Sequence, residues 1–491
     1  MRSLINSRPR RIAWAFLAFL LAAGTALLLA WLASAESSHI LSNGEIMKRF
    51  LAMPALVAIA TLALVSACAG PPAAAAAAPA APVAAAPPPP FMAQVVGVQW
   101  LNPLQRRDYP TEWQLLWTLG VAAPNENDDM VRTKPQKYAK LQAIGGLAAG
   151  NGGSETFEGF HEKYVSELID RFYDIYFSSS RYFYNAHSLK DKTTRRELAG
   201  IHVEYALPNG RLEPVAAAKY LSETIRKCFL IGNPRFPTAW SRSTLPDVRV
   251  TMGGPNAGFT SLTAALDYLQ AHPDQTVWAM NWDSPSYPPK EDQLNENMVL
   301  LVLAGPNYKT ARDALAWIGR PVDNATAKFA AKDRSAAVVE AWHATLATAA
   351  ANANKTVPEM GYVIHDANIS HPDSGDRMRH LAHVLVLDVP VFDYMKQTFN
   401  TPSILGEMGA GTALTNVALG IAYANHFGKN VLVAGTTDPA HATAVLVTPP
   451  ETVRPIVADK PWFRARGENH AYLMWWGIRH DATFRMQGFS D

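Results

Sequence analysis

Two stretches of the chain repeat one order of predicted elements, and this repetition limits the fold more than any other feature of the sequence. Residues 253–306 read as a glycine turn, a helix of small residues and two strands, in GGPNAG, FTSLTAALDYLQ, TVWAMNWD and ENMVLLVLAGP. Residues 406–450 repeat this order in GEMGAG, TALTNVALGIAYANHF, NVLVAGTTD and ATAVLVTPP. Two equivalent halves of an α/β protein are the simplest account, and similarity of composition alone is the alternative.

The rest of the sequence divides around these halves. Residues 1–68 form a leader, and residues 69–90 form a linker rich in alanine and proline, in which repeated proline prevents continuous helix or sheet. Residues 91–200 form an N-terminal region that begins with the predicted strand QVVGVQWL. We assign residues 201–330 to the first half and 331–491 to the second half. The expected fold class is α/β, with two similar halves and an extra N-terminal α/β region.

The leader contains two apolar runs that leave its topology open. Residues 12–33 carry no charge and are long enough to cross a bilayer. Residues 50–67 follow the basic pair Lys48-Arg49 and end at Cys68, a pattern that resembles a bacterial lipoprotein signal with Cys68 as the lipidated residue. We expect an inner-membrane or periplasmic lipoprotein. If both runs span the membrane, the folded part lies at the cytoplasmic face, but the basic pair between the runs argues against this hairpin.

Charge and cysteine usage exclude several classes of function. The net charge of the chain is +2, and the basic leader accounts for it, so the folded part is close to neutral and has no basic run to bind nucleic acid. Cys68 and Cys228 are the only cysteines, so the folded part can form neither an internal disulfide nor a zinc site built on paired cysteines. The motifs GxSxG, GxxxxGK[ST] and GxGxxG are absent, and we expect no cofactor.

A cluster of histidine and aspartate in HDANISHPDSGDR, residues 365–377, is the strongest candidate for a metal site. It lacks both the HExxH spacing of a helical zinc pair and the full spacing of a calcium loop, so we expect a solvated turn and no metal. His380 and His383 follow in RMRHLAHVLVLDVPVF. We expect them at a helix end or at the edge of the core, before a buried strand.

Trp113, Leu116 and Trp117 share one face of a short predicted helix in DYPTEWQLLWTLGV because their spacing is i, i+3, i+4. This face is a candidate surface for a protein partner. The alternative is packing in the core, where large aromatic residues are usually buried.

The duplicated unit, with an apolar helix starting at a glycine turn in each half, resembles the thiolase and ketoacyl synthase fold. The resemblance implies a nucleophilic cysteine at the start of the first helix, where this chain has Asn256, Ala257 and Gly258. His365 stands where the family has a catalytic histidine, and Glu407 stands where the family has a second one. The resemblance therefore predicts a thiolase-like core without its nucleophile.

A second resemblance covers more of the chain. WLNPLQRRDYPTEWQLLWTLG at 100–120, MNWDSPSYP at 280–288 and LGEMGAGTALTN at 405–416 are similar to the bacterial type VI lipase adaptor family. The resemblance implies a protein that binds a lipase effector and helps to load it onto the secretion spike. Such work takes place in the cytoplasm, which conflicts with a lipoprotein leader.

These observations support two hypotheses of different classes. The first is a non-catalytic adaptor whose partners are a lipase effector and a spike protein, with membrane attachment through the leader. The second is a thiolase-like acyl-transfer or lyase enzyme in which His365 is the base and Glu407 is the acid or orienting group. A homodimer is open in both cases, because thiolase-like proteins are commonly dimers.

Overall fold

The structure is a computed structural model of the chain. It describes residues 90–101, 119, 156–173, 200–234, 245–285, 297–310, 313–329, 332–367 and 374–453. The two apolar runs of the leader, Cys68, and the face of Trp113, Leu116 and Trp117 lie outside these ranges. No helix within the described ranges is both long enough and apolar enough to cross a bilayer.

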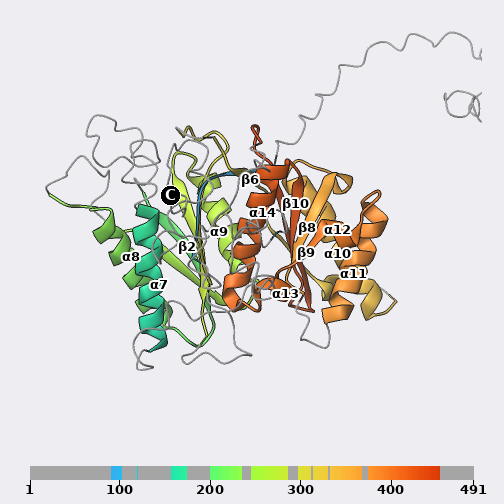
Figure 1. The fold of residues 1–491 in the computed structure, drawn as a ribbon, viewed down its shortest axis with the longest axis horizontal. Helices are drawn as coiled ribbons and strands as arrows, with labels where there is room; N and C mark the ends of the chain where they lie inside the picture. Colours follow the sequence, from blue (N-terminus) through green and yellow to red (C-terminus); the bar gives the residue numbers. More distant parts are fainter. Residues whose placement is uncertain are drawn as a thin grey trace, which may run out of the picture. The chain divides into compact units, whose positions relative to one another are not determined.

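The described strands form one large mixed sheet, in which ten strands lie in the order β3-β2-β4-β5-β1-β6-β11-β10-β8-β9 and β7 pairs with β11 (Figure 1). The strands of the N-terminal part are β1 (Ala93–Leu101), β2 (His202–Pro208), β3 (Asp247–Gly253), β4 (Thr276–Asp283) and β5 (Asn297–Ala304). The later strands are β6 (Ala316–Ile318), β7 (Val322–Ala325), β8 (Met360–His365), β9 (Thr398–Asn400), β10 (Asn430–Gly435) and β11 (His441–Thr448).

The two halves of the sheet have the same pattern of parallel and antiparallel strand pairs, counted from each edge toward the centre. In the first half, β2 pairs in parallel with β3 and β4, and β4, β5 and β1 follow in antiparallel pairs. In the second half, β8 pairs in parallel with β9 and β10, and β10, β11 and β6 follow in antiparallel pairs. The strands β1 and β6 meet at the centre. This symmetry confirms the predicted duplication of the α/β fold.

The helices alternate with the strands in the same order in both halves. The long helices are α7 (Phe157–Phe172), α8 (Pro214–Cys228), α9 (Ala257–Ala271), α10 (Arg334–Asn352), α11 (Ser374–Asp388) and α14 (Thr412–Phe427). The short ones are η5 (Thr326–Lys328), η6 (Val357–Glu359), α12 (Tyr394–Gln397), α13 (Thr401–Leu405) and η7 (Gly409–Gly411). In the first half α7, α8 and α9 follow β1, β2 and β3, and in the second half α10, α11 and α14 follow β6–β7, β8 and β9.

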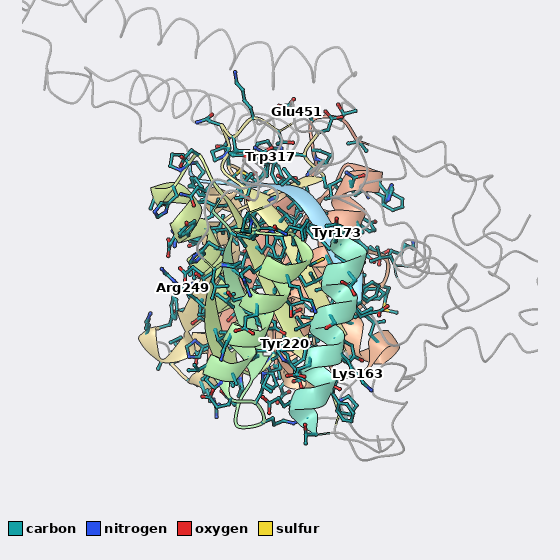
Figure 2. All side chains as sticks on the ribbon, turned by 90° about the vertical axis from the view of Figure 1, so that its left-hand side faces the viewer. Lys163, Tyr173, Tyr220, Arg249, Trp317 and Glu451 are labelled. Carbon is teal, nitrogen blue, oxygen red and sulfur yellow. The ribbon has the colours of Figure 1, made fainter. Side chains whose placement is uncertain are left out.

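Three hydrophobic clusters hold the layers together. The central cluster joins α9 and α14 to one face of strands from both halves. A second cluster packs α7 and α8 on the other face of the first half, which Figure 2 shows from the side of these two helices. A third packs α10 and α11 on the other face of the second half. The central strands are therefore covered on both faces, which explains why they read as continuous apolar runs rather than alternating ones.

The helix pair α9 and α14 connects the two halves at close range. A Cβ atom at Gly258 of α9 would lie 2.9 Å from the Cβ of Ala413 and 3.2 Å from the backbone nitrogen of Leu414. Only glycine permits this approach, because ordinary contacts between carbon atoms are about 3.5–4.0 Å. Since α14 is surrounded by protein, almost all of its residues are buried, and these include the polar residues Thr415, Asn416 and Asn425.

Two features differ from the sequence-based description. The predicted strand in VLVLDVPVF was wrong, because α11 continues to Asp388. Its buried residues Leu381, Val384 and Leu385 recur at helical spacing and join the third cluster. Strand β1, from the predicted N-terminal region, lies between β5 and β6 and so belongs to the sheet of the two halves. The domain boundaries themselves stay a prediction.

Candidate functional site

The start of α9 lies against the end of β10, so the two halves meet where this helix of the first half begins. Asn256 is the N-cap of α9 but makes no capping hydrogen bond with its side chain. Instead its Nδ2 donates to Thr443 Oγ1 at 3.4 Å. A Cβ atom at Gly435, the last residue of β10, would lie 2.3 Å from Asn256 Oδ1. The glycine therefore lets the helix start pack on the strand end.

This helix start carries no thiol or hydroxyl group. Asn256, Ala257 and Gly258 occupy it, as the sequence indicated. The first hydroxyl groups inside α9 are those of Thr260, which is exposed, and Ser261, which is fully buried with no hydrogen-bond partner for its Oγ among the described residues. A buried hydroxyl without an adjacent base is not an activated nucleophile.

His365 ends β8 and is buried beside the same region, since its register partner in β10 is Ala434, next to Gly435. Burial lowers the pKa of His365 to about 4, so its ring is neutral near neutral pH. The Ala367 N–H donates to Nδ1 at 3.3 Å, which leaves the ring proton on Nε2, 3.4 Å from the hydroxyl oxygen of Tyr394.

Glu407 lies between α13 and η7 and is half-buried. The hydrogen bonds of His365 to described residues go to Ala367 and Tyr394, and none goes to Glu407. The structure therefore places His365 at the end of β8 and does not join the two residues into a hydrogen-bonded acid–base pair.

The turn GEMGAG is held by polar residues of the first half. Asp283, at the end of β4, accepts the N–H of Ala410 at 2.9 Å and that of Ser284 at 2.7 Å, and Arg211 Nη1 lies 3.3 Å from it. Burial raises the pKa of Asp283 to about 6, against the lowering effect of these hydrogen bonds and of Arg211.

Two asparagines complete this contact between the halves. The side chains of Asn281 and Asn297 donate to the carbonyl oxygen of Gly411 at 2.7 and 2.8 Å. Sequence reasoning missed these residues, although the polar ending NWD of an otherwise apolar strand was a signal. The turn thus fastens the two halves rather than presenting a reactive group.

A second buried carboxylate fixes the hairpin between β10 and β11. Asp366 Oδ1 accepts the N–H of Thr436 at 2.5 Å and its hydroxyl at 2.9 Å, and Asp366 Oδ2 accepts the hydroxyl of Thr437 at 2.7 Å. Burial raises the pKa of Asp366 while these bonds lower it. Because β8 and β10 are parallel neighbours, their carboxyl ends coincide and the aspartate reaches both threonines.

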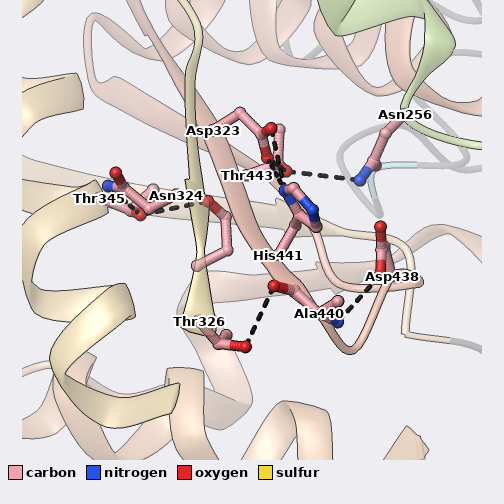
Figure 3. A network of polar contacts seen from close by, with 10 residues as sticks. Asn256, Asp323, Asn324, Thr326, Thr345, Asp438, Ala440, His441 and Thr443 are labelled. Carbon is pink, nitrogen blue, oxygen red and sulfur yellow. Dashed lines mark hydrogen bonds and ion pairs between the residues drawn. The ribbon is translucent and has the colours of Figure 1, made fainter. Parts of the chain in front are cut away.

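The far side of this hairpin carries a polar network that Figure 3 shows. His441 Nδ1 lies 2.9 Å from Asp323 Oδ1, and Thr443 donates to the same oxygen at 2.8 Å. Since a carboxylate only accepts, Nδ1 carries the proton in this pair. Asn256 extends the network to α9 through Thr443. Two surface hollows adjoin here, of about 350 Å³ and about 490 Å³, and both are lined by Asp438 and His441.

An exposed apolar surface lies at the end of α11 and the loop into α12. We call it the α11–α12 surface, and its residues, with their exposed fractions, are Val386 (58%), Leu387 (62%), Val391 (97%) and Met395 (85%). Val391 has φ 59°, a left-handed conformation that is strained for a β-branched residue. Strain of this kind persists where the surrounding structure imposes it, and it is frequent at functional positions.

Comparison with solved structures finds similarity to ketosynthases. One is the KS8 ketosynthase domain of OzmH from Streptomyces albus JA3453, at 13% identity and TM-score 0.45, covering 77% of this chain and 100% of that chain. Another is the ketosynthase of module 6 of the bacillaene synthase from Bacillus subtilis 168, at 11% identity and TM-score 0.46, covering 73% and 70%. These scores are low, and the duplicated topology of this chain is established by its own strand order.

The sequence comparisons point to one family. No curated protein sequence matches the chain significantly. Residues 315–449, from β6 to the last strand, match the family described as type VI lipase adapter protein Tla3, C-terminal. The resemblance to type VI lipase adaptors that the sequence indicated is therefore confirmed over the second half of the fold.

Proposed function

We propose that the chain is a non-catalytic adaptor that binds a type VI lipase effector and helps to load it onto the secretion spike. The observation that carries the proposal is the match of residues 315–449 to the C-terminal region of a lipase adapter family. The start of α9 supports it, because Asn256, Ala257 and Gly258 offer no nucleophile there.

The α11–α12 surface is the proposed contact with the lipase. It lies inside the matched residues, and it gathers four large apolar side chains that are each more than half exposed. Large apolar side chains that are exposed together in one segment are typical of protein interaction sites. Val389, which is buried, anchors the loop from below, while Val391 projects outward. The strained conformation of Val391 thus displays an apolar side chain to solvent.

The leader and the assembly state add two further proposals. The leader would anchor the chain to the inner membrane or to a periplasmic membrane face through lipidated Cys68, and the cytoplasmic face is the alternative. A homodimer would leave the α11–α12 surface available if it formed at the other end of the sheet, along β3. Light scattering of the detergent-solubilised chain would reveal a dimer as a doubled mass.

The proposed function is tested by capture of lipase activity. The full-length chain, tagged at its C-terminus and solubilised in mild detergent, is immobilised and incubated with lysate of the source cells. Fluorogenic phosphatidylcholine then measures the phospholipase activity retained, and mass spectrometry identifies the retained enzyme and any spike protein. We expect strong retention, with a loss of about tenfold for Val386→Asp and Met395→Asp. A matched control is Val215→Asp, an exposed apolar residue of α8. Retention no greater than that of bare resin would refute the adaptor function.

The enzyme alternative rests on the thiolase-like topology and on His365. It predicts turnover of an acyl thioester by the purified chain and its loss in His365→Ala. The hydrogen bonds of His365 to described residues go to Ala367 and Tyr394 and none goes to Glu407, which favours a structural role instead. Retention of all phenotype-complementing activity by the alanine variant would eliminate this alternative.

A further inference from the structure

The two hollows beside the β10–β11 hairpin form one groove on the surface of the second half. The hollow of about 350 Å³ is bounded by α10 and α11, and the hollow of about 490 Å³ is bounded by α9 and β7. Asp438 and His441 line both, so the hollows adjoin at these two side chains. Figure 3 shows His441 between Asp323 and Asp438, at this junction. We call the combined feature the hairpin groove.

The two ends of the hairpin groove differ in charge. The α10–α11 end presents Arg334, Arg379 and His380 together with Asp376 and Asp438, above a floor that includes buried Trp342. Arg379 is paired with Asp376 at 3.3 Å, whereas Arg334 has no ion-pair partner among the described residues. An arginine is charged at every physiological pH, so the position beside Arg334 favours an anionic group.

The α9 end is acidic, because Asp438 and two further aspartates line it and no described lysine or arginine does. Asp267 and Asp323 line it together with the hydroxyl groups of Thr260 and Thr263. Asp267 is paired with Arg320, and Asp323 accepts from His441 and Thr443. No cluster that could hold a metal ion occurs among the residues that the structure describes. A positively charged side chain or amine is the group that this end fits.

The hairpin groove is also continuous with the α11–α12 surface. Asp376, Arg379, His383 and Val386 are exposed and recur at spacings of three and four along α11, so they form one stripe on the helix. The stripe begins at the rim of the groove and ends at the apolar residues. Arg379 and Val386 are seven residues apart, or about 10 Å along the helix axis. A partner of ordinary interface size can cover both features.

We propose that the hairpin groove receives an extended segment of the lipase effector, with an acidic side chain at the arginine end and a basic side chain at the aspartate end. The inference rests on the proposed function and adds the chemistry and orientation of the segment. Charge complementarity of this kind sets the register of a complex and suppresses wrong partners. The α11–α12 surface supplies apolar contact area, and the charges of the groove set the orientation of the bound segment.

The test uses the same capture of phospholipase activity by the full-length chain, read with fluorogenic phosphatidylcholine. Three groove variants are compared with matched controls outside the groove. Arg334→Glu is matched by Glu340→Arg on α10, Asp267→Lys by Asp274→Lys after α9, and Thr260→Trp by Gln270→Trp on α9. All six positions are exposed, so the folded state should tolerate each change, and melting curves followed by circular dichroism verify this.

We expect each groove variant to raise the amount of chain needed to retain half of the activity by about tenfold, with controls within about twofold. Retention by the two charge reversals should also become less sensitive to salt. If the unaltered chain retains the lipase and the groove variants retain it equally well, the groove inference is overturned and the adaptor function stands. If only Thr260→Trp has an effect, the assigned charges are wrong. If the unaltered chain retains no lipase, the proposed function itself fails.

Discussion

Asp283 should make the stability of the fold fall as pH rises from about 4 to about 6, and Asp283→Asn should remove this dependence. The side chain is 2% exposed, and burial raises its pKa from 3.8 to about 6. Because the folded state holds the proton more tightly than the unfolded state, the stabilising contribution is complete below about pH 4 and is lost as pH rises through about 6. At 1.36 kcal/mol per pH unit, the change amounts to about 3 kcal/mol.

The assay is urea unfolding of both proteins, followed by tryptophan fluorescence, at several pH values between about 4 and about 7. The amide introduced by Asp283→Asn does not titrate, so the unfolding free energy of the wild type relative to the variant should fall by about 3 kcal/mol over this range. Other perturbed groups, such as His161, His365 and Asp366, are common to both proteins and cancel in the difference. Asp274→Asn, on an exposed loop, is the control and should give a flat difference. A flat difference for Asp283→Asn as well would show that the carboxylate stays ionised and that burial does not dominate its pKa.

Three more predictions concern single residues. Gly258→Ala should lower the free energy of unfolding by about 1–3 kcal/mol, because its Cβ would overlap Ala413, whereas Gly254→Ala, with open space around it, should change it little; urea titrations of the two decide this. Val391→Gly should raise the free energy of unfolding by about 1 kcal/mol by relieving the left-handed strain, yet weaken lipase capture. A variant that loses both stability and lipase capture would contradict the proposed display role. His365→Ala should cost about 2 kcal/mol of stability by leaving a cavity while lipase capture at low temperature is unchanged; loss of capture by a folded variant would show that the residue has more than a structural role.

Much of the fold could be read from local pattern. The helix predicted in TALTNVALGIAYANHF is α14, with the same bounds, since a glycine turn precedes it and Gly428 ends it in a left-handed conformation. The strands TVWAMNWD and NVLVAGTTD were found because apolar runs of this length, bounded by turn residues, are typical of strands covered on both faces. The prediction of a strand in VLVLDVPVF failed, because a short apolar run does not distinguish a buried strand from the buried side of a helix.

The candidate site depended far more on contacts between distant residues. The sequence alone determined the duplicated order of elements, the absence of a nucleophile at the start of α9 and the resemblance to lipase adaptors, because each is a property of consecutive residues. Only the tertiary structure decided that Asp283 holds the turn at Ala410, that Asn256 reaches Thr443, and that α10, α11 and the hairpin enclose a charged groove. These contacts join residues more than a hundred positions apart or on separate elements, and the packing of the two halves brings them together.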